Sequence, residues 1–214
     1  AYTTPDKAQE EIETILGRKI NPQRIIKFDA GRQESSWVKN CLAVGLSSAF
    51  LEPLEATSIH SSIVQAHNFI TEFLRPSLND TVNEGSMKIY NQRTRIMFDD
   101  VRDFLVMHYQ GGRDDSEFWR YIGTGATRTD YVSMLIETAK SRVPNINDFP
   151  TYPGSAGWPL YSYVMAGLHL IDKDSAKQEL DIQLPYIGPL RHVTIEAFYD
   201  YQDKWAAEIK NCLT

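Results

Sequence analysis

Residues 37–60, WVKNCLAVGLSSAFLEPLEATSIH, combine several features that a segment used only for packing would not need. A turn of small residues (45–49) is followed by the run EPLE (52–55), in which two carboxylates stand on either side of a proline. Small residues let the backbone approach a flat group such as a cofactor ring, and proline stiffens the turn that carries the acids. Thr57 and Ser58 then come at a predicted helix N-terminus, where unpaired N–H groups favour an anion.

Around this segment, apolar periodicity predicts a chain that is mainly α with a small β component near its N-terminus. A helix is predicted from Glu55 to Leu74, with Ile59, Ile63 and Ile70 at helical spacing. Further helices are predicted at 5–17, 80–109, 116–121, 129–141, 161–171 and 189–212, strands at 24–30 and 37–44, and a loop at 144–157.

Composition excludes several classes of protein. A length of 214 residues is enough for one large domain or two small ones. The net charge of −6 argues against nucleic acid or an anionic membrane as a partner, and no apolar run is long enough to span a bilayer. The two cysteines lack metal-site spacing, and no metal site is predicted from the five histidines. Cys41 is predicted to be a buried free thiol, which suits a cytoplasmic protein.

Three blocks of the sequence resemble the flavin-dependent tryptophan halogenases. Residues 37–59 fill every fixed position of the family pattern W-x-x-N-C-x-x-x-G-x-x-x-x-F-x-E-P-L-E-[AS]-T-[GS]-I. Residues 97–119, MFDDVRDFLVMHYQGGRDDSEFW, resemble the helix, His-Tyr step and Phe-Trp close of that family, and residues 158–168, WPLYSYVMAGL, give a weaker match. The order and spread of the blocks make a chance similarity implausible.

The resemblance implies a division of the chain. Residues 1–54 would be the tail end of a flavin monooxygenase-like FAD-binding α/β module, and residues 55–214 a helical substrate-side subdomain. In this family the dinucleotide-binding fingerprint and the catalytic lysine lie in the N-terminal half, and the chain contains no GxGxxG. We therefore expect it to be the C-terminal part of a longer enzyme and to be inactive by itself.

The activity that the resemblance implies is halogenation of an aromatic substrate. Reduced FAD from a separate flavin reductase, O2 and a halide ion would generate hypohalous acid. This oxidant would reach a second pocket, where a lysine and a glutamate direct it onto an aromatic ring. The partners implied are the N-terminal FAD-binding half, the reductase and the aromatic small molecule.

Glu55 corresponds to the family's catalytic glutamate. A carboxylate at that place can stabilise a cationic ring intermediate, remove its proton or polarise the oxidant. The structural alternative is an acidic residue in the first turn of a helix, stabilised by the helix dipole. Glu52 is expected to be structural, bound to backbone N–H groups and shaping the wall between flavin and substrate.

Thr57 and Ser58 correspond to the family's halide site, where backbone N–H groups hold the anion. Many members have glycine at the second position, so Ser58 fits only if the backbone there does not need a positive φ. Plain capping of the helix is the alternative for both residues.

By the same resemblance, the turn before the acids would lie along the flavin. Its cofactor-binding residues would be Gly45, Leu46, Ser47, Phe50, Leu51, Glu52 and Pro53. A tight buried turn is the alternative explanation for the same residue types.

Tyr152, Trp158 and Tyr161 are the candidate walls of the substrate pocket, and packing in the core is the alternative. The segment around them is shorter than in tryptophan-specific members, and Asp148 is the one acidic residue near enough to serve as an ammonium clamp. An indole or phenol other than free tryptophan is therefore at least as consistent with the sequence.

Two other functions remain open at this point. A related flavin monooxygenase would hydroxylate or epoxidise without halide. A stand-alone helical interaction module would have no activity at all, whereas an exposed apolar face where the flavin module should dock would argue for a part of a larger enzyme.

Overall fold

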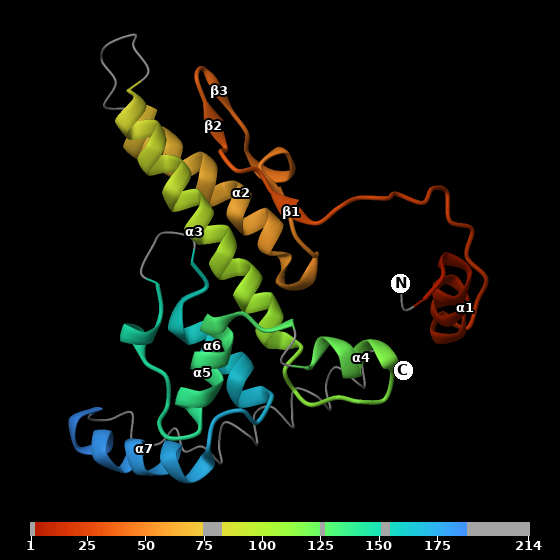
Figure 1. The fold of residues 1–214 in the computed structure, drawn as a ribbon. Coiled ribbons are helices and arrows are strands. Elements are labelled where there is room, and N and C mark those ends of the chain that lie inside the picture. Colours follow the sequence, from red (N-terminus) through yellow and green to blue (C-terminus); the bar gives the residue numbers. More distant parts are fainter. Residues whose placement is uncertain (1–2, 75–82, 125–126, 151–154, 188–214) are drawn as a thin grey trace.

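The computed structural model describes residues 3–74, 83–124, 127–150 and 155–187, including side chains as far as residue 182. Within these ranges the chain is mostly helical with four short strands, as predicted (Figure 1). The elements are α1 (Pro5–Leu16), β1 (Gly31–Arg32), β2 (Trp37–Val38), β3 (Cys41–Leu42), η1 (Gly45–Ser47), β4 (Ala49–Phe50), η2 (Leu54–Ala56), α2 (Thr57–Asn68), η3 (Phe69–Leu74), α3 (Glu84–His108), α4 (Glu117–Ile122), α5 (Asp130–Ala139), η5 (Ile146–Asp148), α6 (Gly157–Gly167) and α7 (Lys173–Ile187).

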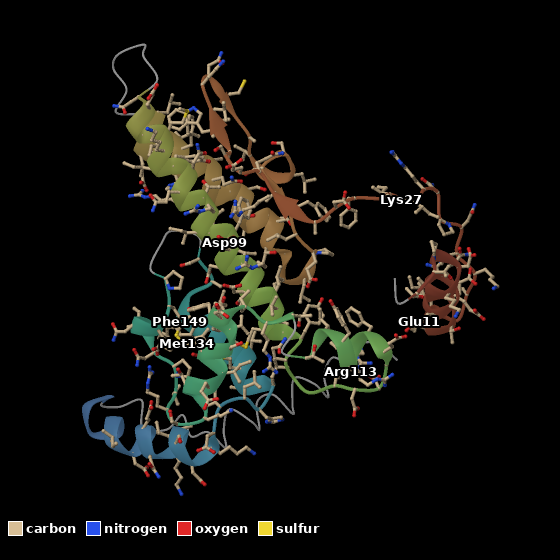
Figure 2. The ribbon with its side chains drawn as sticks, viewed as in Figure 1. Glu11, Lys27, Asp99, Arg113, Met134 and Phe149 are labelled. Atoms are coloured by element: carbon tan, nitrogen blue, oxygen red, sulfur yellow. The ribbon has the colours of Figure 1, made fainter. Side chains whose placement is uncertain are left out.

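The N-terminal helix forms as predicted, but the strand predicted at 24–30 does not. Thr4 caps α1 by accepting a hydrogen bond from the Lys7 backbone, and Gly17 ends it with a φ of 63°. Residues 18–30 are extended without strand pairing, and Figure 1 shows them leading away to α1, with Lys27 labelled on them in Figure 2. β-propensity alone is insufficient there, because an isolated extended segment has no ladder partner.

The strand predicted at 37–44 is a tight hairpin of two strands. β2 pairs antiparallel with β3, and Lys39 at the turn has a φ of 53°. β1 pairs with β4, so that Gly31 lies opposite Phe50. Cys41 is exposed on the hairpin, so the prediction of a buried thiol is wrong. In a strand whose two faces differ in exposure, an apolar neighbourhood in sequence does not decide which face a side chain takes.

Helix α2 buries its polar face. Thr57, Ser61 and Gln65 are buried, whereas Ile59 and Ile63 are exposed. The helix was predicted to run from Glu55 to Leu74, and η3 does continue it to Leu74 in π-helical form. The apolar stripe therefore exists at the predicted spacing, but it faces away from the described part of the chain.

Helix α3 connects two regions of packed side chains, and Figure 1 shows it passing α2 at one end and α5 and α6 at the other. Beside α2, Tyr90 packs edge-on against Trp37 and Phe73, with ring centroids 5.9 and 5.3 Å apart. At the other end the core consists of Phe104, Met107, Val132, Leu135, Ile136, Ala139, Phe149, Tyr161 and Met165. Because both regions share α3, that helix fixes the hairpin side relative to the α5–α6 side.

The C-terminal boundaries differ from the prediction. α6 begins at Gly157 (φ 67°), four residues earlier than expected, because Pro159 suits the first turn of a helix. α7 was not predicted, although Asp172 caps it by accepting a hydrogen bond from the Ser175 backbone at 2.8 Å. The helix predicted at 189–212 lies outside the described residues.

The mixed charges of α3 divide into a surface pair and a buried acid. Asp99, labelled in Figure 2, forms ion pairs with Arg32 and Arg102 at 3.2 and 3.6 Å. Asp100 is only 3% exposed, and its Oδ2 accepts a hydrogen bond from the Ala156 backbone at 2.6 Å. Burial raises the pKa of Asp100 to about 6, against the two hydrogen bonds that lower it.

We expect Asp100→Asn to remove a pH-dependent loss of stability. The pKa of Asp100 is higher in the folded chain than in the unfolded chain. Between about pH 4 and pH 6 the Asp100 carboxyl group is therefore protonated in the folded chain and ionised in the unfolded chain. The unfolding free energy therefore falls as pH rises through that window and levels off above it, by about 3 kcal/mol in total for a shift of this size. Urea unfolding of both proteins at pH 4 and pH 7 measures this, and parallel pH dependences would contradict it.

Candidate active site

The EPLE run forms a strained turn at the start of α2. Pro53 takes a φ of −77°, whereas Glu55 and Ala56 both lie in the left-handed region, at φ values of 61° and 52°. A non-glycine residue in the left-handed conformation destabilises the fold by about 1 kcal/mol or more. Two such residues in succession therefore need support from the surrounding structure. Strain of this kind is typical of functional sites.

We expect Ala56→Gly to stabilise the chain by about 1 kcal/mol, because glycine adopts a positive φ without the Cβ clash. The matched control is Ala66→Gly in α2, where glycine should instead destabilise by up to about 1 kcal/mol. Urea denaturation midpoints of the two variants should thus move in opposite directions. A loss of stability in both variants would mean that the turn is not strained.

Both carboxylates of the EPLE run are held by the C-terminal end of α3. The Tyr109 hydroxyl donates to Glu52 Oε1 at 2.7 Å, and His108 Nε2 lies 3.3 Å from Glu55 Oε1. Burial, followed by the hydrogen bond to Glu52 and the charge of that carboxylate, raises the pKa of Tyr109 to about 12. The partner of Glu52 is thus a side-chain hydroxyl, where backbone N–H groups were predicted. Glu55 remains 51% exposed and can contact a further molecule.

The start of α2 is not capped by the predicted residues. Ala56 occupies the N-cap position and supplies no side-chain hydrogen bond, while the Thr57 hydroxyl donates backward to the Leu54 carbonyl at 3.4 Å. The capping alternative for Thr57 and Ser58 is therefore wrong. Ser58 is not among the residues with positive φ, so serine is compatible with the backbone at that position. The first N–H groups of α2 remain without a side-chain acceptor from the N-cap.

The small-residue turn is fastened to α2 by a buried polar network. Gln65, 2% exposed, donates from Nε2 to Ser48 Oγ at 2.7 Å and accepts from the Gly45 backbone at 3.1 Å. Ser48 Oγ also lies 2.7 Å from Ser36 Oγ. Gly45 has a φ of 64°, and a Cβ there would come within 2.9 Å of Ser62 Oγ, so glycine is required for this approach.

The predicted cofactor residues of the turn differ in exposure. Leu46 is 69% exposed, whereas Phe50 and Leu51 are half-buried, and Ser47 bonds to the Val44 backbone at 2.9 Å. Leu51 also lines a hollow of about 380 Å³ beside α3. The alternative of a wholly buried turn is therefore wrong, because one side of the turn presents an apolar surface.

The predicted substrate residues do not come together. Tyr161 is 0% exposed in the core and its hydroxyl donates to the Asp100 carbonyl at 3.0 Å, so its prediction as a pocket wall is wrong. Trp158 is exposed and lines a hollow of about 480 Å³ with residues 143–146 and α7, and Glu55 does not line it. Tyr152 lies outside the described residues.

The aromatic residues nearest to the carboxylates are different ones. Tyr109, which binds Glu52, packs against Phe118 and Trp119 with ring centroids 6.1 and 5.7 Å apart. Arg113, labelled in Figure 2, lies over the Trp119 ring at 4.4 Å. The chain's Phe-Trp step thus supports the end of α3 that holds the EPLE turn.

Two classes of site find no support in the described ranges. Within them, no group of three or more His, Cys, Asp or Glu side chains could hold a metal ion. Nor does any helix of those ranges have the length and apolar character needed to cross a membrane.

Comparison with known proteins decides the family. The sequence model of the family described as tryptophan halogenase matches residues 1–179, which is most of the chain. The chain belongs to the tryptophan halogenase family. Its family segment includes the EPLE turn, the start of α2 and the His-Tyr end of α3, so the contacts described above lie within the part that is matched.

Curated tryptophan halogenases are similar to this chain over much of its length. The 7-chloro-L-tryptophan 6-halogenase KtzR of Kutzneria is 30% identical over 216 residues, covering 94% of this chain and 40% of KtzR. The tryptophan 6-halogenase SttH of Streptomyces toxytricini is 35% identical over 170 residues, covering 76% of this chain and 30% of SttH. This tryptophan halogenase chain therefore spans less than half of the length of these relatives.

Solved structures of the family agree. The tryptophan C-6 flavin-dependent halogenase Tar14, from taromycin biosynthesis, superimposes with a TM-score of 0.65 at 30% identity, over 82% of this chain and 35% of Tar14. The crystal structure of SttH gives 0.64 at 27% identity, over 85% of this chain and 37% of SttH. The tryptophan halogenase fold described above is thus shared with experimentally determined members.

Sequence reasoning missed two residues of this candidate site, His108 and Tyr109. The five histidines are considered above only as metal ligands, although a histidine at a helix C-terminus such as His108 is also favoured by the helix dipole. The sequence did contain one signal, the adjacent His-Tyr pair at a helix end. Both side chains can hydrogen-bond to carboxylates, and the EPLE run supplies two carboxylates in one turn. Spacing could not show that the two pairs meet, because they are 53 and 57 residues apart.

Proposed function

We propose that this chain is the C-terminal part of an FADH2-dependent halogenase that uses O2 and a halide ion to halogenate an indole- or phenol-type substrate. The observation that carries the proposal is the placement of Glu55. It is half-exposed in a strained turn, and its neighbouring carboxylate is occupied by Tyr109. Glu55 is therefore the carboxylate of the EPLE run that can meet a substrate, and family membership supports the same residue.

The flavin would be held along the turn that Gln65 fastens to α2. Gly45, Leu46 and Ser47 would face the ring, with Phe50, Leu51, Glu52 and Pro53 continuing that surface. The exposed apolar Leu46 and the rigid backbone around it fit a flat cofactor. Reduced flavin, with O2 and halide, supplies the electrophilic halogen when bound.

The halide would be held at the start of α2 by the backbone N–H groups of Thr57 and Ser58. The uncapped N-terminus of a helix carries partial positive charge and unpaired donors, which suit an anion. Glu55 lies two residues before this site, so one short segment would serve both the halide and the ring chemistry.

Residues 1–54 would complete a flavin-binding module, and residues 55–214 would form the substrate side. The exposed stripe that consists of Ile59 and Ile63 on α2 and Ile70 on η3 would be covered by the N-terminal half of the same enzyme. Such a stripe supports a part of a larger enzyme over the stand-alone interaction module. A flavin reductase would supply the reduced cofactor, in a cytoplasm where the exposed free thiol of Cys41 persists.

At the ring, Glu55 would act by charge and by accepting a proton. An electrophilic halogen makes the attacked ring cationic, and a nearby carboxylate stabilises that charge. The ring C–H bond then breaks, its electrons restore aromaticity, and the proton passes to the carboxylate. Of the predicted substrate residues, only Trp158 is exposed among those described, so the aromatic pocket would be completed elsewhere in the protein.

The test uses the full-length enzyme with reduced FAD, O2, bromide or chloride, and a panel of indoles and phenols. Products are read by mass spectrometry, where halogen isotope patterns are expected. Oxygenated products that form equally well without halide would instead indicate the monooxygenase alternative. Serine at position 58 is compatible with the proposed halide site, because the backbone there does not have a positive φ.

A further inference from the structure

The His108 side chain has more specific contacts than a residue that only faces the helix dipole would need. Its imidazole is mostly buried at the last turn of α3. Nδ1 lies 2.9 Å from the Phe104 carbonyl oxygen, Nε2 lies 3.3 Å from Glu55 Oε1, and the ring packs edge-on against Phe104 at 4.7 Å between centroids. Both nitrogens therefore have a defined partner, and the packing fixes the plane of the ring.

These two contacts restrict which ring nitrogen can donate a hydrogen bond and which can accept one. A carbonyl oxygen can only accept a hydrogen bond, so Nδ1 carries a hydrogen. In a neutral imidazole Nε2 is then an acceptor, and an ionised carboxylate is also an acceptor. A hydrogen bond between Nε2 and Glu55 therefore needs one additional proton, carried either by the imidazole or by the carboxyl group.

We propose that His108 is a positioning residue that shares one proton with Glu55 and thereby fixes the orientation of the carboxylate toward the aromatic substrate. The proposal rests on the proposed function, because it takes Glu55 as the group that meets the ring. Glu52 and Tyr109, the other titratable groups of the same contact, bond to each other. They leave the Glu55–His108 pair as a separate unit.

A double-mutant cycle in the full-length enzyme tests the coupling. His108→Phe keeps the packing on Phe104 but removes both nitrogens, and it should lower the turnover number for halogenation by about 10-fold while KM for the aromatic substrate stays within about 2-fold. In the Glu55→Gln background the same substitution should change turnover by less than about 2-fold, because its effect passes through Glu55. Losses that multiply in the double variant would overturn the proposal.

Tyr109→Phe is the matched control, since it removes the neighbouring hydrogen bond to Glu52 and not the one to Glu55. Its effect should multiply with that of Glu55→Gln. His108→Gln, which can still donate to the carboxylate, should recover part of the turnover lost in His108→Phe. No recovery, or a KM that rises as turnover falls, would mean that His108 only supports the fold.

A readout without turnover separates this proposal from the proposed function. In the full-length enzyme labelled with ¹⁵N-histidine, the His108 signal, assigned by its loss in His108→Phe, should show a protonated Nδ1. An unprotonated Nδ1, or an Nε2 that neither carries a proton nor accepts a hydrogen bond, would overturn the shared-proton arrangement. Absence of any halogenated product from the wild-type enzyme would instead reject the proposed function, whatever the NMR result.

Discussion

In the full-length enzyme, Glu55→Gln is expected to lower halogenation turnover by roughly 10²- to 10⁴-fold, the usual contribution of a positioned acid or base. Glutamine has the size of glutamate, so the left-handed turn and the approach to His108 should persist. It lacks the negative charge and the basic oxygen that a cationic ring needs. Oxidation of reduced flavin should stay nearly unchanged, because that reaction does not involve the ring.

The measurement compares halogenated product with flavin oxidation in the same reaction. Glu84→Gln is the matched control, because Glu84 is an exposed glutamate in the first turn of α3. If Glu55 served only the helix dipole, both variants would show the same small loss of stability, about 0.3–1 kcal/mol, and full halogenation. A collapse of flavin oxidation in Glu55→Gln would likewise assign the residue to the structure of the turn.

Gln65→Leu is expected to lower the unfolding free energy by about 3 kcal/mol and to abolish flavin binding in the full-length enzyme. Leucine leaves the Gly45 N–H without its acceptor, which costs roughly 1–3 kcal/mol, and it removes the bond from Gln65 to Ser48 Oγ, which then keeps only Ser36 Oγ as a partner. The turn that these bonds fasten to α2 is the proposed flavin surface. Stability and cofactor binding should therefore be lost together.

Urea unfolding and flavin fluorescence titration measure the two effects of this variant. Gln92→Leu provides the control, because Gln92 is an exposed glutamine on α3 and the substitution there should change stability by no more than about 0.5 kcal/mol. Flavin binding that survives a large loss of stability in Gln65→Leu would separate the turn from the cofactor site. An unchanged midpoint would contradict the network itself.

Local chemistry made much of this chain predictable. Thr4 and Gly17 mark the ends of α1, and Ser116 and Thr129 cap α4 and α5 close to the predicted starts of these helices, because capping depends on residues within one turn. The EPLE run and the family pattern in residues 37–60 are likewise contiguous, so the sequence alone was enough to predict the family, which is confirmed, and to propose Glu55 as a catalytic candidate.

Predictions that depended on a partner distant in sequence were less reliable. Residues 24–30 have the composition of a strand but pair with no strand in the part of the chain that the structure describes. Tyr161 is an aromatic residue of the kind that lines ligand pockets. In the structure its hydroxyl donates to the Asp100 carbonyl on α3, and its ring packs in the core. Composition gives the chemical capacity of a side chain and not the surface that it faces.

The sequence by itself determined the family, the mostly helical class and the identity of the carboxylate-bearing turn, because each depends on residues adjacent in the chain. Only the tertiary structure decided that α2 buries its polar face, that Gln65 holds the small-residue turn, and that His108 and Tyr109 bind Glu55 and Glu52. These contacts join residues separated by 20 to 57 positions. They exist because α3 packs along α2 and ends beside the turn, and such packing depends on the burial of the whole chain and not on local propensity.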